Sequence, residues 1–115
     1  MTEYIGGWTA ANKWELLMDW TIDIFRFSTE RSDKFTIKIP KHLAFGIYEG
    51  YSDLHKTVID AILYPDHFGG TDYVAMIKEN YASHPNKDFK ILKQYAQKTR
   101  NVLLFKEIEA MEHTE

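Results

Sequence analysis

The sequence predicts an α+β fold in which helices pack on one small layer of antiparallel sheet. Alternating apolar and polar residues predict strands, a short continuous apolar run predicts a buried strand, and apolar residues at helical spacing predict the helices. The predicted sheet consists of a β-hairpin at about 20–28 and 34–40 and a C-terminal strand at about 101–106. The predicted helices lie at about 9–19, 52–63, 72–83 and 87–99.

The first predicted helix begins near Thr9, whose hydroxyl can cap the helix, and carries Trp14, Leu17 and Met18 as an apolar stripe. The pattern of residues that follows this helix fits both the two-residue period of a strand and the spacing of a helix. Its apolar residues alternate as in a strand, whereas its acidic residues lie four apart as on a helix face. The strand is favoured because residues 21–27 are rich in β-branched and aromatic side chains.

A second alternating run, at residues 35–39, completes the predicted hairpin, with Ile24 opposite Ile37. Pro40 ends this strand, because proline cannot donate a hydrogen bond to a neighbouring strand. Residues 44–49 fit either a further strand or an irregular connection, and the sequence leaves both open.

Capping residues mark the later helices. Ser52 is positioned to cap the helix at 52–63, which Pro65 ends. Thr71 or Asp72 can cap the next helix. The apolar run from Val102 to Phe105 is interpreted as a buried strand, although it could instead prolong the helix before it.

Length and composition indicate one folded domain, residues 1–115. Domains cluster at about 100–150 residues, and 44% apolar with 27% charged residues is a globular composition. The chain has no cysteine, which excludes disulfides and thiolate sites. It also shows no membrane-length apolar run and no signal-peptide pattern, so we expect a cytoplasmic protein.

Charge argues against general nucleic-acid binding, because the net charge is −3. Residues 87–106 nevertheless hold six Lys or Arg and a single Asp, a local charge of +5. A basic nucleic-acid surface and a solvated helix face are the two interpretations of this segment.

No catalytic or metal-binding signature is present. The closest two histidines, His55 and His67, are 12 positions apart, which does not fit a helical metal pair. No nucleophile elbow and no complete phosphate-binding glycine motif occurs, so we expect no cofactor and favour a protein that is not an enzyme. The alternative is a small hydrolase or isomerase with His67 as general acid or base.

The segment 64–73 is the candidate partner-binding loop. It combines flat side chains suited to contact with two carboxylates suited to a basic partner. The same aromatic residues could instead pack the loop onto the core. The candidate residues are Tyr64, Asp66, His67, Phe68, Asp72 and Tyr73.

The run Ser52-Asp53-Leu54-His55, followed by Thr57, Pro65 and Gly69, resembles the first helix and following loop of the barstar family of ribonuclease inhibitors. The resemblance covers roughly 20 of the 115 residues. It implies an inhibitor that presents an acidic, aromatic loop. The next helix lacks the aspartates that meet the nuclease in that family, and the strand expected after it has no counterpart, so the chain is not assigned to the family.

We therefore expect a small protein-binding domain, such as an inhibitor, an immunity protein or a regulatory accessory factor. Its three Trp, seven Tyr and seven Phe exceed what a core of this size readily hides, so some should face a partner. That partner is another protein or a second copy of the chain. The sequence does not distinguish the two.

Overall fold

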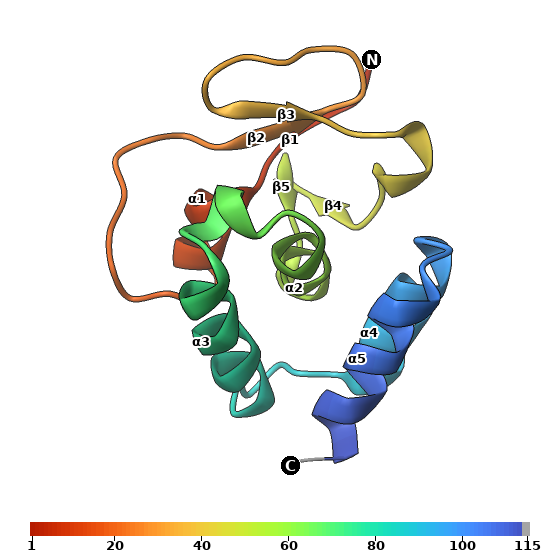
Figure 1. Ribbon diagram of the computed structural model, residues 1–115. Helices are drawn as coiled ribbons and strands as arrows, with labels where there is room; N and C mark the ends of the chain where they lie inside the picture. The colour runs from red at the N-terminus through yellow and green to blue at the C-terminus, as the bar shows by residue number, and fades with distance from the viewer. Residues whose placement is uncertain (114–115) are drawn as a thin grey trace.

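Helix α2 (Leu54–Leu63) lies at the centre of the molecule. Figure 1 shows it nearly end-on, with α3 on one side and the α4–α5 pair on the other. The computed structural model describes residues 1–113. The surrounding helices are α1 (Gly7–Lys13), α3 (Thr71–Ala82), α4 (Phe89–Lys98) and α5 (Val102–His113). The predicted α+β class is confirmed.

Five short strands form one mixed sheet within the described residues, in the order β3-β2-β1-β5-β4. Strand β1 pairs antiparallel with β2 and parallel with β5, and β4 pairs antiparallel with β5. The strands are β1 (Glu3–Ile5), β2 (Arg26–Ser28), β3 (Thr36–Lys38), β4 (Ile47–Tyr48) and β5 (Tyr51–Ser52). Residues 44–49, left open by the sequence, thus contain a strand.

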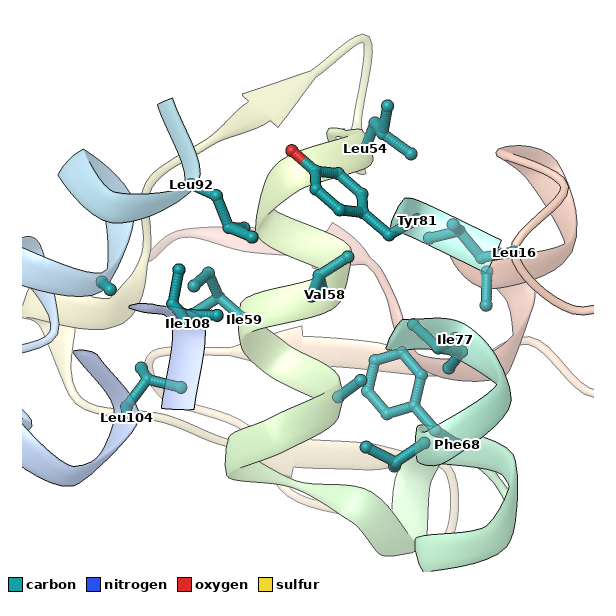
Figure 2. Packing of buried hydrophobic residues seen from close by; sticks show 14 of the residues in the cluster. Leu16, Leu54, Val58, Ile59, Phe68, Ile77, Tyr81, Leu92, Leu104 and Ile108 are labelled. Carbon is teal, nitrogen blue, oxygen red and sulfur yellow. The ribbon is translucent and has the colours of Figure 1, made fainter. Parts of the chain in front are cut away.

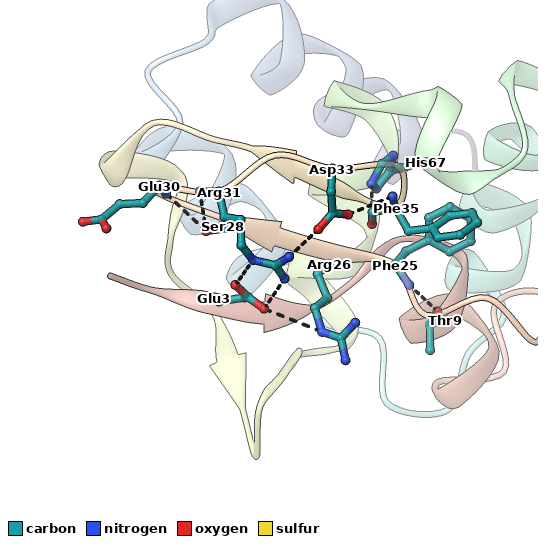
Figure 3. A network of polar contacts seen from close by, with 10 residues as sticks. All are labelled: Glu3, Thr9, Phe25, Arg26, Ser28, Glu30, Arg31, Asp33, Phe35 and His67. Carbon is teal, nitrogen blue, oxygen red and sulfur yellow. Dashed lines mark hydrogen bonds and ion pairs between the residues drawn. The ribbon is translucent and has the colours of Figure 1, made fainter.

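The predicted antiparallel hairpin was wrong, because β2 and β3 run parallel and Ile37 lies opposite Phe27. A connection of residues 29–35 suffices to return the chain, since each strand is only three residues long and an extended residue spans about 3.3–3.6 Å. The Ser28 hydroxyl accepts from the backbone N–H of Glu30 and Arg31. The Arg31 guanidinium then bridges Glu3 and Asp33, as Figure 3 shows.

The first half of the predicted hairpin and the end of the first predicted helix were also wrong. Helix α1 spans residues 7–13 instead of 9–19, and residues 20–25 form a loop. The helix ends because Glu15 adopts a left-handed conformation, with a φ of 63°. Thr9 lies inside α1, where its hydroxyl binds the backbone of the returning loop instead of capping the helix.

The predicted C-terminal strand was wrong as well, because residues 102–113 form α5. Leu104 and Ile108 are buried at the i, i+4 spacing of a helix face. The Asn101 side chain accepts from the N–H of Leu104 and starts this new helix. A four-residue apolar run has no period of its own, which is why the sequence did not separate helix from strand.

The three central helices were predicted nearly correctly, but their caps differ. Asp53, not Ser52, caps α2 by accepting from the N–H of Lys56 at 2.7 Å. Ser52 lies in β5, and its hydroxyl bonds to Thr57. Gly70 occupies the capping position of α3 without a side-chain bond, and Asp88 caps α4.

The core surrounds α2, whose Val58 and Ile59 are fully buried. Figure 2 shows these two side chains between residues of α3, α4 and α5. Burying a side chain of this size contributes about 1.5–3 kcal/mol. The rest of the labelled cluster consists of Leu16, Leu54, Phe68, Ile77, Tyr81, Leu92, Leu104 and Ile108.

Candidate functional site

The aromatic residues of the segment 64–73 mostly face the core. A 3₁₀ turn, Pro65–Phe68, follows α2 and ends at Gly69, whose φ of 91° is left-handed. Phe68 is fully buried, and the half-buried Tyr64 packs against Phe27. These two side chains hold the turn to the rest of the fold and offer little contact area to a partner.

His67 is packed like a core residue. Its ring packs against the rings of Phe25 and Phe27. Its Nε2 is 3.2 Å from the carbonyl oxygen of Phe35 (Figure 3). Burial lowers the pKa of the imidazole, against the opposing effect of the backbone hydrogen bonds. No carboxylate in residues 1–113 accepts a hydrogen bond from this ring. The geometry therefore does not favour His67 as a general acid or base.

The remaining candidate residues face solvent at least in part. Asp66 and Asp72 are exposed. Tyr73 packs on Trp8 at a ring separation of 4.9 Å, and its hydroxyl donates to a carboxylate oxygen of Asp19 at 3.1 Å. This bond joins the predicted loop to the loop after α1, which the sequence did not identify as a site.

The loop after α1, residues 14–25, carries the most exposed large apolar side chains among the residues that the structure describes. Trp20 is 87% exposed and Ile22 is 96% exposed. Met18 and Ile24 are also exposed. We name residues 18–24, together with the neighbouring Tyr73, the Trp20 loop surface. A hollow of about 410 Å³ lies beside it, lined by Asn12, Glu15, Leu17, Met18 and Trp20.

Side chains of α1 hold the backbone of this loop. The amide of Asn12 donates to the carbonyl oxygens of Leu17 and Asp19, both at 2.9 Å, and the Trp8 indole donates to Asp19 at 2.8 Å. The Thr9 hydroxyl donates to the carbonyl of Asp23 at 2.9 Å and accepts from the N–H of Phe25 at 3.0 Å. The loop is thus ordered by its backbone, while its apolar side chains remain free for contact.

The two sequence segments that carry the Trp20 loop surface are acidic. Residues 14–25 contain Glu15, Asp19 and Asp23, and residues 64–77 contain Asp66 and Asp72, with no Lys or Arg in either segment. None of these five carboxylates forms an ion pair within the part of the chain that the structure describes. An apolar centre with an unpaired acidic margin fits a partner with basic groups around an apolar depression.

Two features of the sequence indicate that this segment could present apolar side chains outward. The alternation of Trp20, Ile22 and Ile24 indicates that one side of the segment is apolar, and the aromatic excess indicates that some rings face outward. The same alternation, together with the β-branched and aromatic residues, predicts a strand. The hydrogen bonds that hold the loop come from side chains of α1, and neither the alternation nor the aromatic content of the sequence predicts them.

Lys56 carries the other unusual chemistry, because it is fully buried in α2. Its ammonium contacts Asp60 and donates to the Tyr4 hydroxyl at 2.9 Å, while that hydroxyl donates to Asp60 at 2.7 Å. Burial raises the pKa of Tyr4, and it raises the pKa of Asp60 against the opposing charge of Lys56. All three side chains are buried and hydrogen-bonded to one another, so this cluster connects β1 to α2.

The basic segment 87–106 is partly engaged within the fold. Lys93 pairs with Glu112 at 2.9 Å, and the ammonium of Lys98 lies over the rings of Phe45 and Tyr95.

Within residues 1–113, no three His, Asp or Glu side chains cluster as metal ligands would. None of the helices described has both the length and the apolar character needed to cross a bilayer.

Comparisons with known proteins return no match to any protein-family model, any curated protein or any solved structure. The resemblance to the barstar family therefore rests only on the residues that carry it. In the structure, these residues form the end of β5, the first turns of α2 and the 3₁₀ turn that follows α2.

Proposed function

We propose that this protein is a protein-binding domain that holds its partner through the Trp20 loop surface. The observation that carries the proposal is that Trp20 and Ile22 are almost entirely exposed on a loop whose backbone is fixed by hydrogen bonds. Trp is a frequent centre of binding energy in protein interfaces. A loop that is already ordered loses less conformational entropy on binding, which supports affinity.

The proposed role belongs to the class of inhibitors, immunity proteins and regulatory accessory proteins. In such proteins the contact surface is itself the functional element. The predicted residues Asp66 and Asp72 contribute as part of the acidic margin, where exposed charge speeds association with a basic partner. Tyr73 links this margin to the loop through Asp19.

The proposal includes a cytoplasmic location. The chain has no cysteine, so the core and the polar contacts stabilise the fold without disulfides. Fractionation of host cells with an antibody against the protein tests this part. Recovery outside the cytoplasmic fraction would contradict it.

The binding experiment is affinity capture from the host with the tagged full-length chain, quantified by mass spectrometry. The test variant is Trp20→Ala/Ile22→Ala, and the matched control is Ile47→Ala/Tyr48→Ala, which removes two exposed apolar side chains of β4. We expect a stoichiometric partner that is lost with the test variant and kept with the control.

Calorimetry with the purified partner then measures the affinity change. Truncation of a central Trp costs at least about 2 kcal/mol, which is roughly a thirtyfold loss of affinity. A partner held equally by the wild type and the test variant would exclude the Trp20 loop surface as its binding site.

A further inference from the structure

A second exposed apolar surface lies where α4 turns into α5. Val102 and Leu103 are 68% and 78% exposed at the start of α5. We name residues 96–106 the α4–α5 corner. A pocket of about 250 Å³ opens there, lined by Ala96, Gln97, Arg100, Asn101, Val102 and Phe105.

The charge of the α4–α5 corner is opposite to that of the Trp20 loop surface. Residues 96–106 contain Lys98, Arg100 and Lys106 and no Asp or Glu. Neither Arg100 nor Lys106 forms an ion pair within residues 1–113. The corner therefore combines an apolar pocket with basic residues, which complements the acidic loop.

Arg100 occupies a strained position at this pocket. Its φ is 60°, in the left-handed region, directly after α4 and the capping residue Thr99. Glycine is the usual residue at this point, because other residues adopt the conformation at a cost of about 1–2 kcal/mol. Arg100 is one of the residues that line the pocket.

The two surfaces lie on opposite sides of the molecule. In Figure 1 the loop before β2 is at the left edge, and the turn between α4 and α5 is at the right, at the upper end of that helix pair. They therefore cannot meet within one chain. Two copies, in contrast, can each present the surface that the other lacks.

We propose that a second copy of this chain docks its Trp20 loop surface on the α4–α5 corner. Trp20 enters the pocket, and Asp19 and Asp23 face Arg100 and Lys106. The pocket is smaller than the roughly 300–1,000 Å³ of small-molecule sites, so it suits a single large side chain. This inference rests on the proposed function, because it names the partner of the same loop.

The contact joins two different surfaces, so a bound pair still has one loop and one corner free. Such head-to-tail contacts close into rings or extend into chains instead of stopping at a symmetric dimer. The opposite charges predict that assembly weakens as salt is added.

The experiment is sedimentation velocity of the full-length chain over a wide range of concentration. Two variants each damage one surface: Trp20→Asp on the loop and Leu103→Asp at the corner. We expect the wild type to assemble with rising concentration and each variant alone to stay monomeric. An equimolar mixture should form dimers that do not grow, because only one intact loop and one intact corner remain per pair.

Milder variants guard against misfolding. Trp20→Ala and Leu103→Ala should each weaken assembly at least about tenfold. Arg100→Gly should raise the unfolding midpoint, because glycine adopts the left-handed conformation freely, while it weakens assembly. Unchanged assembly of Arg100→Gly would contradict the pocket assignment.

Three results would overturn the inference: a wild type that stays monomeric, assembly of either aspartate variant alone, or no dimer in their mixture. A monomeric wild type that still captures a foreign partner through Trp20 would leave the proposed function intact. If neither partner capture nor self-assembly depended on Trp20, both the proposed function and this inference would be wrong.

Discussion

The Trp20 loop and the 3₁₀ turn after α2 are rich in similar residues, yet they present them in opposite directions. In the turn, Phe68 is fully buried and His67 packs against the rings of Phe25 and Phe27. In the loop, Trp20 and Ile22 extend into solvent. The difference teaches that apolar content alone does not show which side chains are exposed. The elements that hold the backbone decide which way the side chains face.

Truncation of one aromatic ring in each region gives the largest contrast. We expect Phe68→Ala to lower the free energy of unfolding by about 3–5 kcal/mol, because it leaves a cavity in the core. Trp20→Ala should change it by no more than about 0.5 kcal/mol, because the ring is exposed. Urea unfolding measures both values. Similar losses for the two variants would show that Trp20 also packs on the fold.

The hydrogen bonds from α1 provide the next test. Asn12→Ala removes the amide that holds the carbonyls of Leu17 and Asp19, with an expected loss of about 1–3 kcal/mol. The exposed Asn86 supplies the control variant, Asn86→Ala, with little expected change. Hydrogen exchange of residues 18–24 should accelerate only in the first variant. Unchanged exchange would mean that Trp8 and Thr9 suffice to order the loop.

The buried histidine of the turn predicts a pH dependence that the Trp20 loop does not share. Burial lowers the pKa of His67 in the folded state, whereas the unfolded imidazole titrates near about 6.5. The contribution to stability is therefore complete above this pH. It is lost as the pH falls, because only the unfolded chain then takes up the proton.

Unfolding at pH 7 and pH 5 measures this effect. His67→Leu should reduce the loss of stability between the two values, and some loss should remain because burial also lowers the pKa of His55. The exposed His42 supplies the control, His42→Leu. An identical pH dependence in the wild type and His67→Leu would contradict the buried, neutral state of His67.

The smallest expected effect concerns the bond between Tyr73 of α3 and Asp19 of the Trp20 loop. Tyr73→Phe removes the hydroxyl that donates to Asp19 but keeps the ring on Trp8. We expect a change of about 0.5 kcal/mol or less in the free energy of unfolding, because the bond is exposed. Affinity for a captured partner should change by less than about threefold. A larger loss of affinity would assign Tyr73 a direct role in contact.

Both successes and failures of the sequence analysis have local explanations. The ends of α2 were predictable because Pro65 and a polar cap act within a few residues of the helix. The binding segment was predicted at 64–73, and of its six candidate residues the structure exposes the two carboxylates and leaves Tyr64 and Tyr73 partly exposed. The outward-facing Trp20 and Ile22 were assigned to a strand, since alternation is the same for a paired strand and an anchored loop.

By itself, the sequence determined the α+β class and the central helices. Composition indicates the fold class, and caps and prolines set helix ends within a few residues, so these features can be predicted from local sequence. The tertiary structure alone decided the parallel pairing of β2 with β3, the helical state of α5 and the outward orientation of Trp20. The sheet edge and the loop depend on side chains such as Glu3 and Thr9, which bind Arg31 and Asp23, whereas α5 depends on the burial of Leu104 and Ile108 in the core. Short apolar segments have no strong preference of their own.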